Sequence, residues 1–174
     1  MEPKSTQAMT LEHPTDLFFD QLRVLYSAKA QVILSLPELA ARATFPDLRR
    51  LLSDHEKPSQ RHKAMLLSIF ERHGAPPGGE ICSGVKTLIE CGGERLARAG
   101  DDKVRDLLLV SHCNLIKHYE IAGLGFATSL AECLEMHREA EVLGSILAQE
   151  KDLTHRLART AADLFGPCMA AGLE

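Results

Sequence analysis

Polar side chains interrupt apolar stripes near the middles of four predicted helices, and their chemistry suits ion pairing or metal binding. Along the 3–4 spacing that faces a bundle core, Lys29 interrupts the first stripe and Glu150 the last. Because helix middles meet at one level in an antiparallel bundle, we expect a polar layer across the core. Nine residues make up this predicted layer: Lys29, His55, Ser59, His62, Asn114, Lys117, Glu120, Glu150 and Thr154.

A buried layer of this kind requires partners, since charged side chains are rarely buried unless they pair or hold a metal ion. Carboxylates and imidazoles can bind metals, whereas a lysine ammonium can only donate hydrogen bonds. For any single member, the alternative is a place at the edge of its stripe with the head group in water. The coincidence on four helices favours the buried layer.

The elements that must position these residues are helices, because sustained strand-like alternation is missing from the sequence. We therefore predict an all-α, antiparallel four-helix bundle with an additional shorter helix. Residues 14–165 would form this single domain, between a flexible N-terminal tail at 1–13 and a C-terminal tail at 166–174. The predicted helices cover residues 14–43, 46–73, 80–99, 101–130 and 135–164.

Local breakers set these boundaries. Pro46 suits a first helical turn but not a helix interior, and Gly100 before Asp101 pairs a helix end with an N-cap. The run from Gly74 to Gly79 is the strongest break in the chain. Inside the second helix, Pro58 removes one backbone hydrogen bond, so a kink is expected there; the same steric argument equally allows a helix break at the surface.

Composition narrows the classes of function. Net charge is −4, aromatic residues make up 5% and Trp is absent, so we expect no nucleic-acid binding. No apolar run is long enough to span a membrane, and none at the N-terminus resembles a secretion signal. The cysteine count of 5 is odd and the spacings are irregular, which favours reduced thiols and a cytoplasmic location.

Several short segments resemble a known family. The most specific is His118-Tyr119-Glu120-Ile121-Ala122, which follows Val104-Arg105-Asp106. Weaker matches are residues 22–28, 36–40, Cys82 with 88–90, and 150–151. On these residues the chain resembles the YciE/YciF-like family of ferritin-like bacterial proteins associated with stress. The resemblance implies a ferritin-like bundle, a homodimer, and acidic residues on four helices that hold two metal ions.

The chain departs from the family pattern at the metal site. Lys29 and Lys117 stand where the family has Glu, Ser59 follows Lys57-Pro58 where the family has Glu-Glu-Thr, and Thr154 stands where it has Asp. Because an ammonium has no lone pair for a metal, we predict that the paired-metal site is lost. The two lysines would instead replace the cations and pair with the remaining acids, Glu150 and Glu120.

The resulting prediction is a stress-associated, ferritin-like protein with a degenerate di-metal site. It would have no catalytic residues and no cofactor, and it would act through protein contacts as a homodimer. The alternative is a metal-binding oxidoreductase or metal-storage protein with an altered mono- or dinuclear site for iron, manganese or zinc. The ligands of a mononuclear site would be Glu120, Glu150, His55 and His62.

Overall fold

The computed structural model describes residues 10–78 and 81–166, and its secondary structure there is helical throughout. The predicted tails lie mostly outside this part, at residues 1–9 and 167–174, as does Cys168. None of the described helices is long and apolar enough to cross a membrane. The helices are α1 (Pro14–Arg42), α2 (Pro46–Asp54), α3 (Glu56–His73), α4 (Ser83–Ala97), α5 (Asp102–Cys133) and α6 (His137–Phe165).

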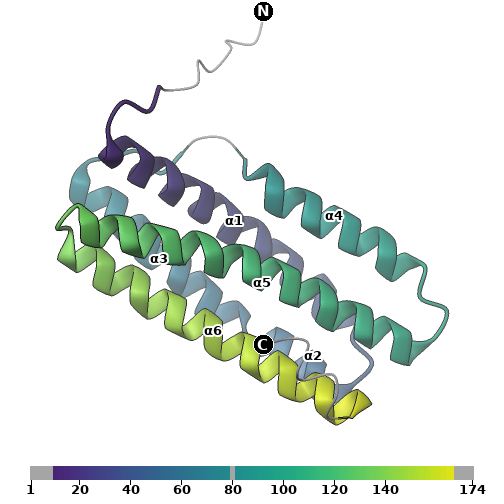
Figure 1. Ribbon diagram of the computed structural model, residues 1–174. Coiled ribbons are helices and arrows are strands. Elements are labelled where there is room, and N and C mark those ends of the chain that lie inside the picture. The colour runs from purple at the N-terminus through teal and green to yellow at the C-terminus, as the bar shows by residue number, and fades with distance from the viewer. Residues whose placement is uncertain (1–9, 79–80, 167–174) are drawn as a thin grey trace, which may run out of the picture.

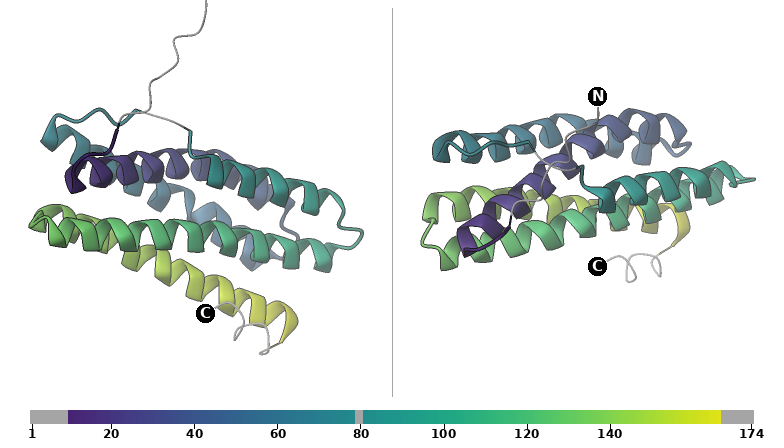
Figure 2. Two further views of the ribbon diagram at one scale, coloured as in Figure 1. Left: turned by 45° about the horizontal axis from the view of Figure 1, so that its top comes forward. Right: turned by 90° about the horizontal axis from the view of Figure 1, so that it is seen from above.

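The core of the structure is a four-helix bundle in which α2 and α3 together form one member, and α4 packs against its outside. The bundle contains α1, the α2–α3 pair, α5 and α6, and α4 packs on α1 and α5 (Figure 1). Figure 2 shows α4 running alongside α5 in both further views. Residues from the start of α1, the end of α5 and the start of α6 share one apolar cluster, so α1 and α6 are each antiparallel to α5.

The second predicted helix is divided, which corrects the expectation of one helix over residues 46–73. α2 ends at Asp54 and α3 begins at Glu56, with His55 between them. The physical reason is Pro58, which has no N–H to donate to the carbonyl of Asp54 and whose ring would clash with it. The break places Pro58 in the first turn of α3, where no intrahelical donor is needed.

Capping groups end the helices close to the predicted positions. The Asp101 side chain accepts hydrogen bonds from Lys103 N at 2.8 Å and Val104 N at 3.1 Å, as an N-cap does. Gly74 ends α3 in the left-handed conformation with φ of 62°, which costs glycine little. The ends of α4, α5 and α6 differ from the prediction by at most three residues.

Apolar clusters lie above and below the middle of the bundle. One, at the end of α1, includes Leu39, Leu52 and Leu157, and the other, at its start, includes Phe18 and Phe70. A third cluster lies between α1, α4 and α5. Most of the buried polar residues lie between the first two clusters, where side chains from every bundle helix meet, whereas Asp106, His112 and Glu139 are buried at other places on α5 and α6.

Candidate functional site

Six buried polar side chains meet in the middle of the bundle, and each is at most 6% exposed. Their helices bring them to one level: Lys29 on α1, His62 on α3, Lys117 and Glu120 on α5, and Glu150 on α6, with His55 at the α2–α3 break. We call these six residues the ion cluster.

Each lysine of the ion cluster contacts both glutamates. Lys29 Nζ lies 2.6 Å from Glu120 Oε1 and 2.5 Å from Glu150 Oε1. Lys117 Nζ lies 2.7 Å from Glu120 Oε2 and 3.0 Å from Glu150 Oε2. The four charged groups therefore form a closed ring, in which two positive and two negative charges alternate. The sequence prediction anticipated these four residues but not that each carboxylate would bridge both ammonium groups.

His55 completes the coordination of Lys117. Lys117 Nζ donates to His55 Nε2 at 2.9 Å, in addition to its bonds to the two carboxylates, so each of its three N–H groups has an acceptor. Burial, and then the charge of Lys117, lower the pKa of His55 to about 3. His55 is therefore neutral, and because Nε2 accepts a hydrogen bond, its proton lies on Nδ1.

His62 supports the opposite side of Glu150. Its Nδ1 donates to Glu150 Oε1 at 2.9 Å, and its Nε2 lies 3.1 Å from Gln149 Oε1. Gln149 is held in turn by a bond from its Nε2 to the carbonyl oxygen of Ser145 at 3.2 Å. Sequence reasoning missed Gln149, since a residue next to Glu150 points about 100° away on an ideal helix. Its side-chain amide reaches His62 from the rim of the ion cluster.

The electrostatics of the ring keep both charge types ionised. Burial alone would lower the pKa of Lys117, but the carboxylates of Glu120 and Glu150 outweigh burial and raise it above the usual range. Burial alone would raise the pKa of Glu150, but the charges of Lys117 and Lys29 hold it well below the usual range. Buried ions of this kind are stable only when the partner charges are present.

Three residues of the predicted layer take no part in this network. Thr154 Oγ1 donates to the carbonyl oxygen of Lys151 in its own helix at 2.7 Å. Ser59 is fully buried, and its hydroxyl has no hydrogen-bond partner among the described residues. Asn114 is partly buried as a residue, but its Oδ1 is buried and also lacks a partner among the described residues. All three lie near the ion cluster without contributing to its charge balance.

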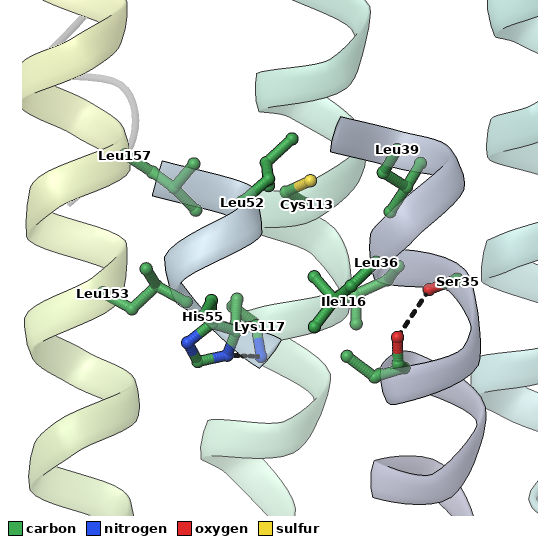
Figure 3. A pocket seen from close by; sticks show the side chains of 11 residues that line it. Ser35, Leu36, Leu39, Leu52, His55, Cys113, Ile116, Lys117, Leu153 and Leu157 are labelled. Atoms are coloured by element: carbon green, nitrogen blue, oxygen red, sulfur yellow. Dashed lines mark hydrogen bonds between the residues drawn. The ribbon is translucent and has the colours of Figure 1, made fainter. Parts of the chain in front are cut away.

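A small cavity adjoins the ion cluster on the side of Lys117. The volume open to the centre of a water molecule is about 20 Å³, enough for roughly one water. Figure 3 shows the hydrogen-bonded pair of His55 and Lys117 at one end of the cavity and leucine side chains around the rest. Space on the Lys117 side is therefore limited to a molecule of about that size, whereas a more open hollow of about 330 Å³ lies against His55 and His62.

The residues present do not fit a pair of metal ions. The ammonium groups of Lys29 and Lys117 lie between the carboxylates, at the positions from which a cation would contact both. In the described ranges, 10–78 and 81–166, no three His, Cys, Asp or Glu side chains are arranged to hold a metal ion. The lone pair of His55 Nε2 is also engaged by Lys117.

Comparison with known proteins places the chain in a family. The family model described as "Domain of unknown function (DUF892)" matches residues 13–166. Protein YciF of Escherichia coli (strain K12) is 26% identical to this chain over 144 residues, which are 82% of this chain and 87% of YciF. The predicted resemblance to the YciE/YciF-like family is confirmed by these matches.

Two solved structures share the fold. The crystal structure of the E. coli stress protein YciF matches with a TM-score of 0.84 and 25% identity, and covers 88% of this chain and 98% of YciF. YcfI of Rhodopseudomonas palustris, which is described as a candidate structural protein, matches with a TM-score of 0.82 and 28% identity over 88% of this chain and 96% of YcfI. The predicted fold class, an all-α ferritin-like bundle, is thereby confirmed.

Proposed function

The chain belongs to the DUF892 family, and from that premise we propose that it is a YciF-like stress-associated protein whose ion cluster replaces a di-metal site. The observation that carries the proposal is the closed ring of Lys29, Lys117, Glu120 and Glu150. The protein would act without catalysis, through contacts with other proteins.

Charge balance supports the replacement. Replacing a Glu by a Lys makes the net charge more positive by about two units. Two such replacements therefore add about four positive charges, which equals the charge of two divalent cations. The two ammonium groups thus neutralise Glu120 and Glu150 in the way that bound cations would neutralise a fully acidic layer. Each ammonium spans the two carboxylates, as a bridged metal pair does in carboxylate bundles.

The surroundings of the ion cluster support a role other than catalysis. Its two ammonium groups are engaged by neighbouring side chains, and the cavity beside Lys117 holds roughly one water molecule. A general acid or base must come within hydrogen-bond reach of its substrate, and the cavity beside Lys117 leaves no such space there. The thiol of Cys113 lines the same cavity, but burial raises its pKa to about 12, which makes it a poor nucleophile.

The remaining parts of the proposal concern partners and location. We propose that the protein is a homodimer, as its resemblance to the family implies. We also propose that it binds no nucleic acid, because its net charge is −4. The free thiols of Cys82, Cys91, Cys113 and Cys133 are compatible with the predicted cytoplasmic location.

Metal content per chain tests the replacement of metals by lysines. The protein is purified without chelator or affinity metal after growth with added iron, manganese and zinc, and every metal is measured by elemental analysis. Less than about a tenth of an equivalent of each metal is expected. About one equivalent would support the mononuclear alternative at Glu120, Glu150, His55 and His62, and about two would restore the di-metal site. Either of these results would overturn the proposal.

A further inference from the structure

A hollow lies between α3 and α6, beside the histidines of the ion cluster. Its volume is about 330 Å³, and it is more open than the small cavity next to Lys117. It brings solvent up to two side chains that are otherwise buried. We call this space the α3–α6 hollow, and the residues that line it include His55, Pro58, His62, Gln149, Asp152 and Arg156.

His55 presents a hydrogen-bond donor to this hollow. Its Nε2 accepts from Lys117 at 2.9 Å, so the proton of the neutral ring lies on Nδ1. In Figure 3 this second nitrogen points away from Lys117, toward α6. Nδ1 has no hydrogen-bond partner among the described residues, and it is not one of their enclosed unpaired atoms. Because the small cavity beside Lys117 presents only apolar surface, Nδ1 reaches solvent through the α3–α6 hollow.

A second donor without an acceptor is the guanidinium group of Arg156. This exposed side chain lines the hollow and forms no ion pair with a carboxylate of the described residues. The other polar groups of the wall satisfy one another. His62 Nε2 lies 3.1 Å from Gln149 Oε1, and Gln149 Nε2 donates to the carbonyl oxygen of Ser145. Two free N–H donors therefore line one space, and an oxygen acceptor would satisfy both.

The charge and the apolar surface of the hollow select among oxygen acceptors. A guanidinium group matches the planar geometry of a carboxylate. Asp152 lines the same space and opposes a second negative charge, which disfavours a dianion such as hydrogen phosphate. Pro58 and Leu153 add apolar surface, on which a hydrocarbon chain can be buried. These features together favour a carboxylate with one charge and a short apolar chain.

We propose that the α3–α6 hollow binds a short-chain monocarboxylate. Its carboxylate accepts from His55 Nδ1 and Arg156, and its chain lies against Pro58 and Leu153. His55 then connects the ligand to the ion cluster, because its Nε2 accepts from Lys117 while its Nδ1 donates to the carboxylate. This site goes beyond the proposed function, since it requires neither a partner protein nor a second chain. It is a binding site, and no bond of the ligand is broken.

Isothermal titration calorimetry with butyrate measures the binding. We expect one site per chain with a dissociation constant on the order of 1 mM, as suits so small a ligand. Acetate should bind roughly tenfold more weakly, because each methylene group removed from water strengthens binding about fourfold. Inorganic phosphate should not saturate the site. No saturable binding of butyrate, or phosphate binding as tight as that of butyrate, would overturn the proposal.

Exposed residues of α6 provide matched variants for the same titration. Arg156→Gln should weaken butyrate binding about tenfold, because a charge-assisted hydrogen bond is lost. Asp152→Asn should tighten it about twofold to fivefold, because a like charge is removed. Arg159→Gln is the control, since it removes the same charge from a neighbouring hollow and should change the affinity by less than about twofold. All three side chains are exposed, so the variants should remain folded, which circular dichroism checks. Equal losses in Arg156→Gln and Arg159→Gln would overturn the proposal.

Nitrogen NMR of histidine-labelled protein tests the contact with His55. Butyrate should shift the Nδ1 resonance of His55 and leave that of His112 unchanged, because His112 packs on α4 instead. In Arg156→Gln at the same butyrate concentration, the shift at His55 should be smaller. Binding without a shift at His55 would overturn the proposal. Neither experiment depends on metal content or on the number of chains, so a failure here leaves the proposed function unaffected.

Discussion

At the scale of single residues, Lys117 is the member of the ion cluster whose ammonium group hydrogen-bonds to three other members. Its ammonium donates to His55, Glu120 and Glu150 from a position that is 3% exposed. Removing it leaves two buried carboxylates facing the single charge of Lys29. Stability at this site therefore depends on the presence of all four charges, and changes to one of them should be more harmful than changes to a matched pair.

We expect Lys117→Ala to lower the free energy of unfolding by about 3–5 kcal/mol, because it leaves an uncompensated negative charge in the core. Urea denaturation followed by circular dichroism measures the loss. Lys151→Ala removes an exposed lysine from α6 and should change stability by less than about 0.5 kcal/mol. Lys117→Met combined with Glu120→Gln removes one charge of each sign and should cost less than Lys117→Ala. An unchanged unfolding midpoint for Lys117→Ala would contradict the buried ring.

His55 should make the protein less stable in mild acid. Its pKa is about 3 in the folded protein, owing to burial and then Lys117, against 6.5 as its ordinary value. Between these values the unfolded chain binds a proton that the folded chain does not. The free energy of unfolding should therefore fall as the pH drops below 6.5, by up to about 1.4 kcal/mol per pH unit from this residue.

Unfolding measured between pH 5 and 7 isolates this effect when wild type is compared with His55→Gln. The glutamine oxygen can still accept a hydrogen bond from Lys117 but does not titrate, so the variant should show a shallower pH dependence. His112 also has a pKa lowered by burial, but it is present in both proteins and cancels in the comparison. Equal slopes would show that His55 is not held neutral by its surroundings.

At the scale of elements, two adjacent glycines in α4 report how closely this helix approaches α5. A Cβ at Gly92 would lie 1.9 Å from His112 Nδ1, whereas a Cβ at Gly93 would meet no atom within 4 Å. The buried imidazole of His112 therefore packs directly on the backbone of α4. If α4 lay farther from α5, substitutions of Gly92 and Gly93 by alanine would change the stability by similar amounts.

Gly92→Ala should destabilise the protein by roughly 1–3 kcal/mol or more, because α4 must move away from a buried ring. Gly93→Ala should be neutral or stabilise it by up to about 1 kcal/mol, since alanine favours the helical conformation. Thermal unfolding of both variants, measured alongside wild type, gives the comparison. If Gly92→Ala were as stable as Gly93→Ala, the packing of His112 against α4 would be wrong.

The helices were the part of the structure that the sequence predicted best, because their ends depend on local chemistry. Asp101 and Gly74 act through their own side chain or backbone conformation, and the periodic stripes identify the buried faces. The α2–α3 break was only partly predicted. The steric demand of Pro58 is local, but whether the chain bends or divides depends on how Leu48, Leu51 and Leu52 pack.

The ion cluster was less predictable, because spacing does not define the rotation of a helix or the path of a long side chain. Thr154 lies in the layer, yet its hydroxyl bonds to its own helix instead. Gln149 lies outside the stripe, yet its amide reaches His62. Whether each lysine contacts both glutamates depends on the positions of the side-chain atoms to within a few tenths of an ångström, and no sequence pattern defines these positions.

At the scale of the whole molecule, the ion cluster divides the core into two apolar halves that share α1, α5 and α6, with α2 in one half and α3 in the other. The layer between them is stable because its charges cancel. The double variant with Lys29→Glu and Lys117→Glu would place four carboxylates at one level with no cation between them. The bundle should then depend on cations supplied from solution.

We expect this double variant to melt well below wild type in the presence of a chelator, because like charges repel strongly when buried. Added Mn²⁺ should raise its melting temperature with a dependence on metal concentration, since a ligand that binds only the folded state stabilises it by mass action. Wild type should melt at the same temperature with chelator and with Mn²⁺. The control combines Lys29→Gln with Lys117→Gln, which removes the ammonium groups but adds no ligand charge, and it should be destabilised without responding comparably to the metal. If Mn²⁺ stabilised wild type as much as the double glutamate variant, the two lysines would not occupy the place of cations.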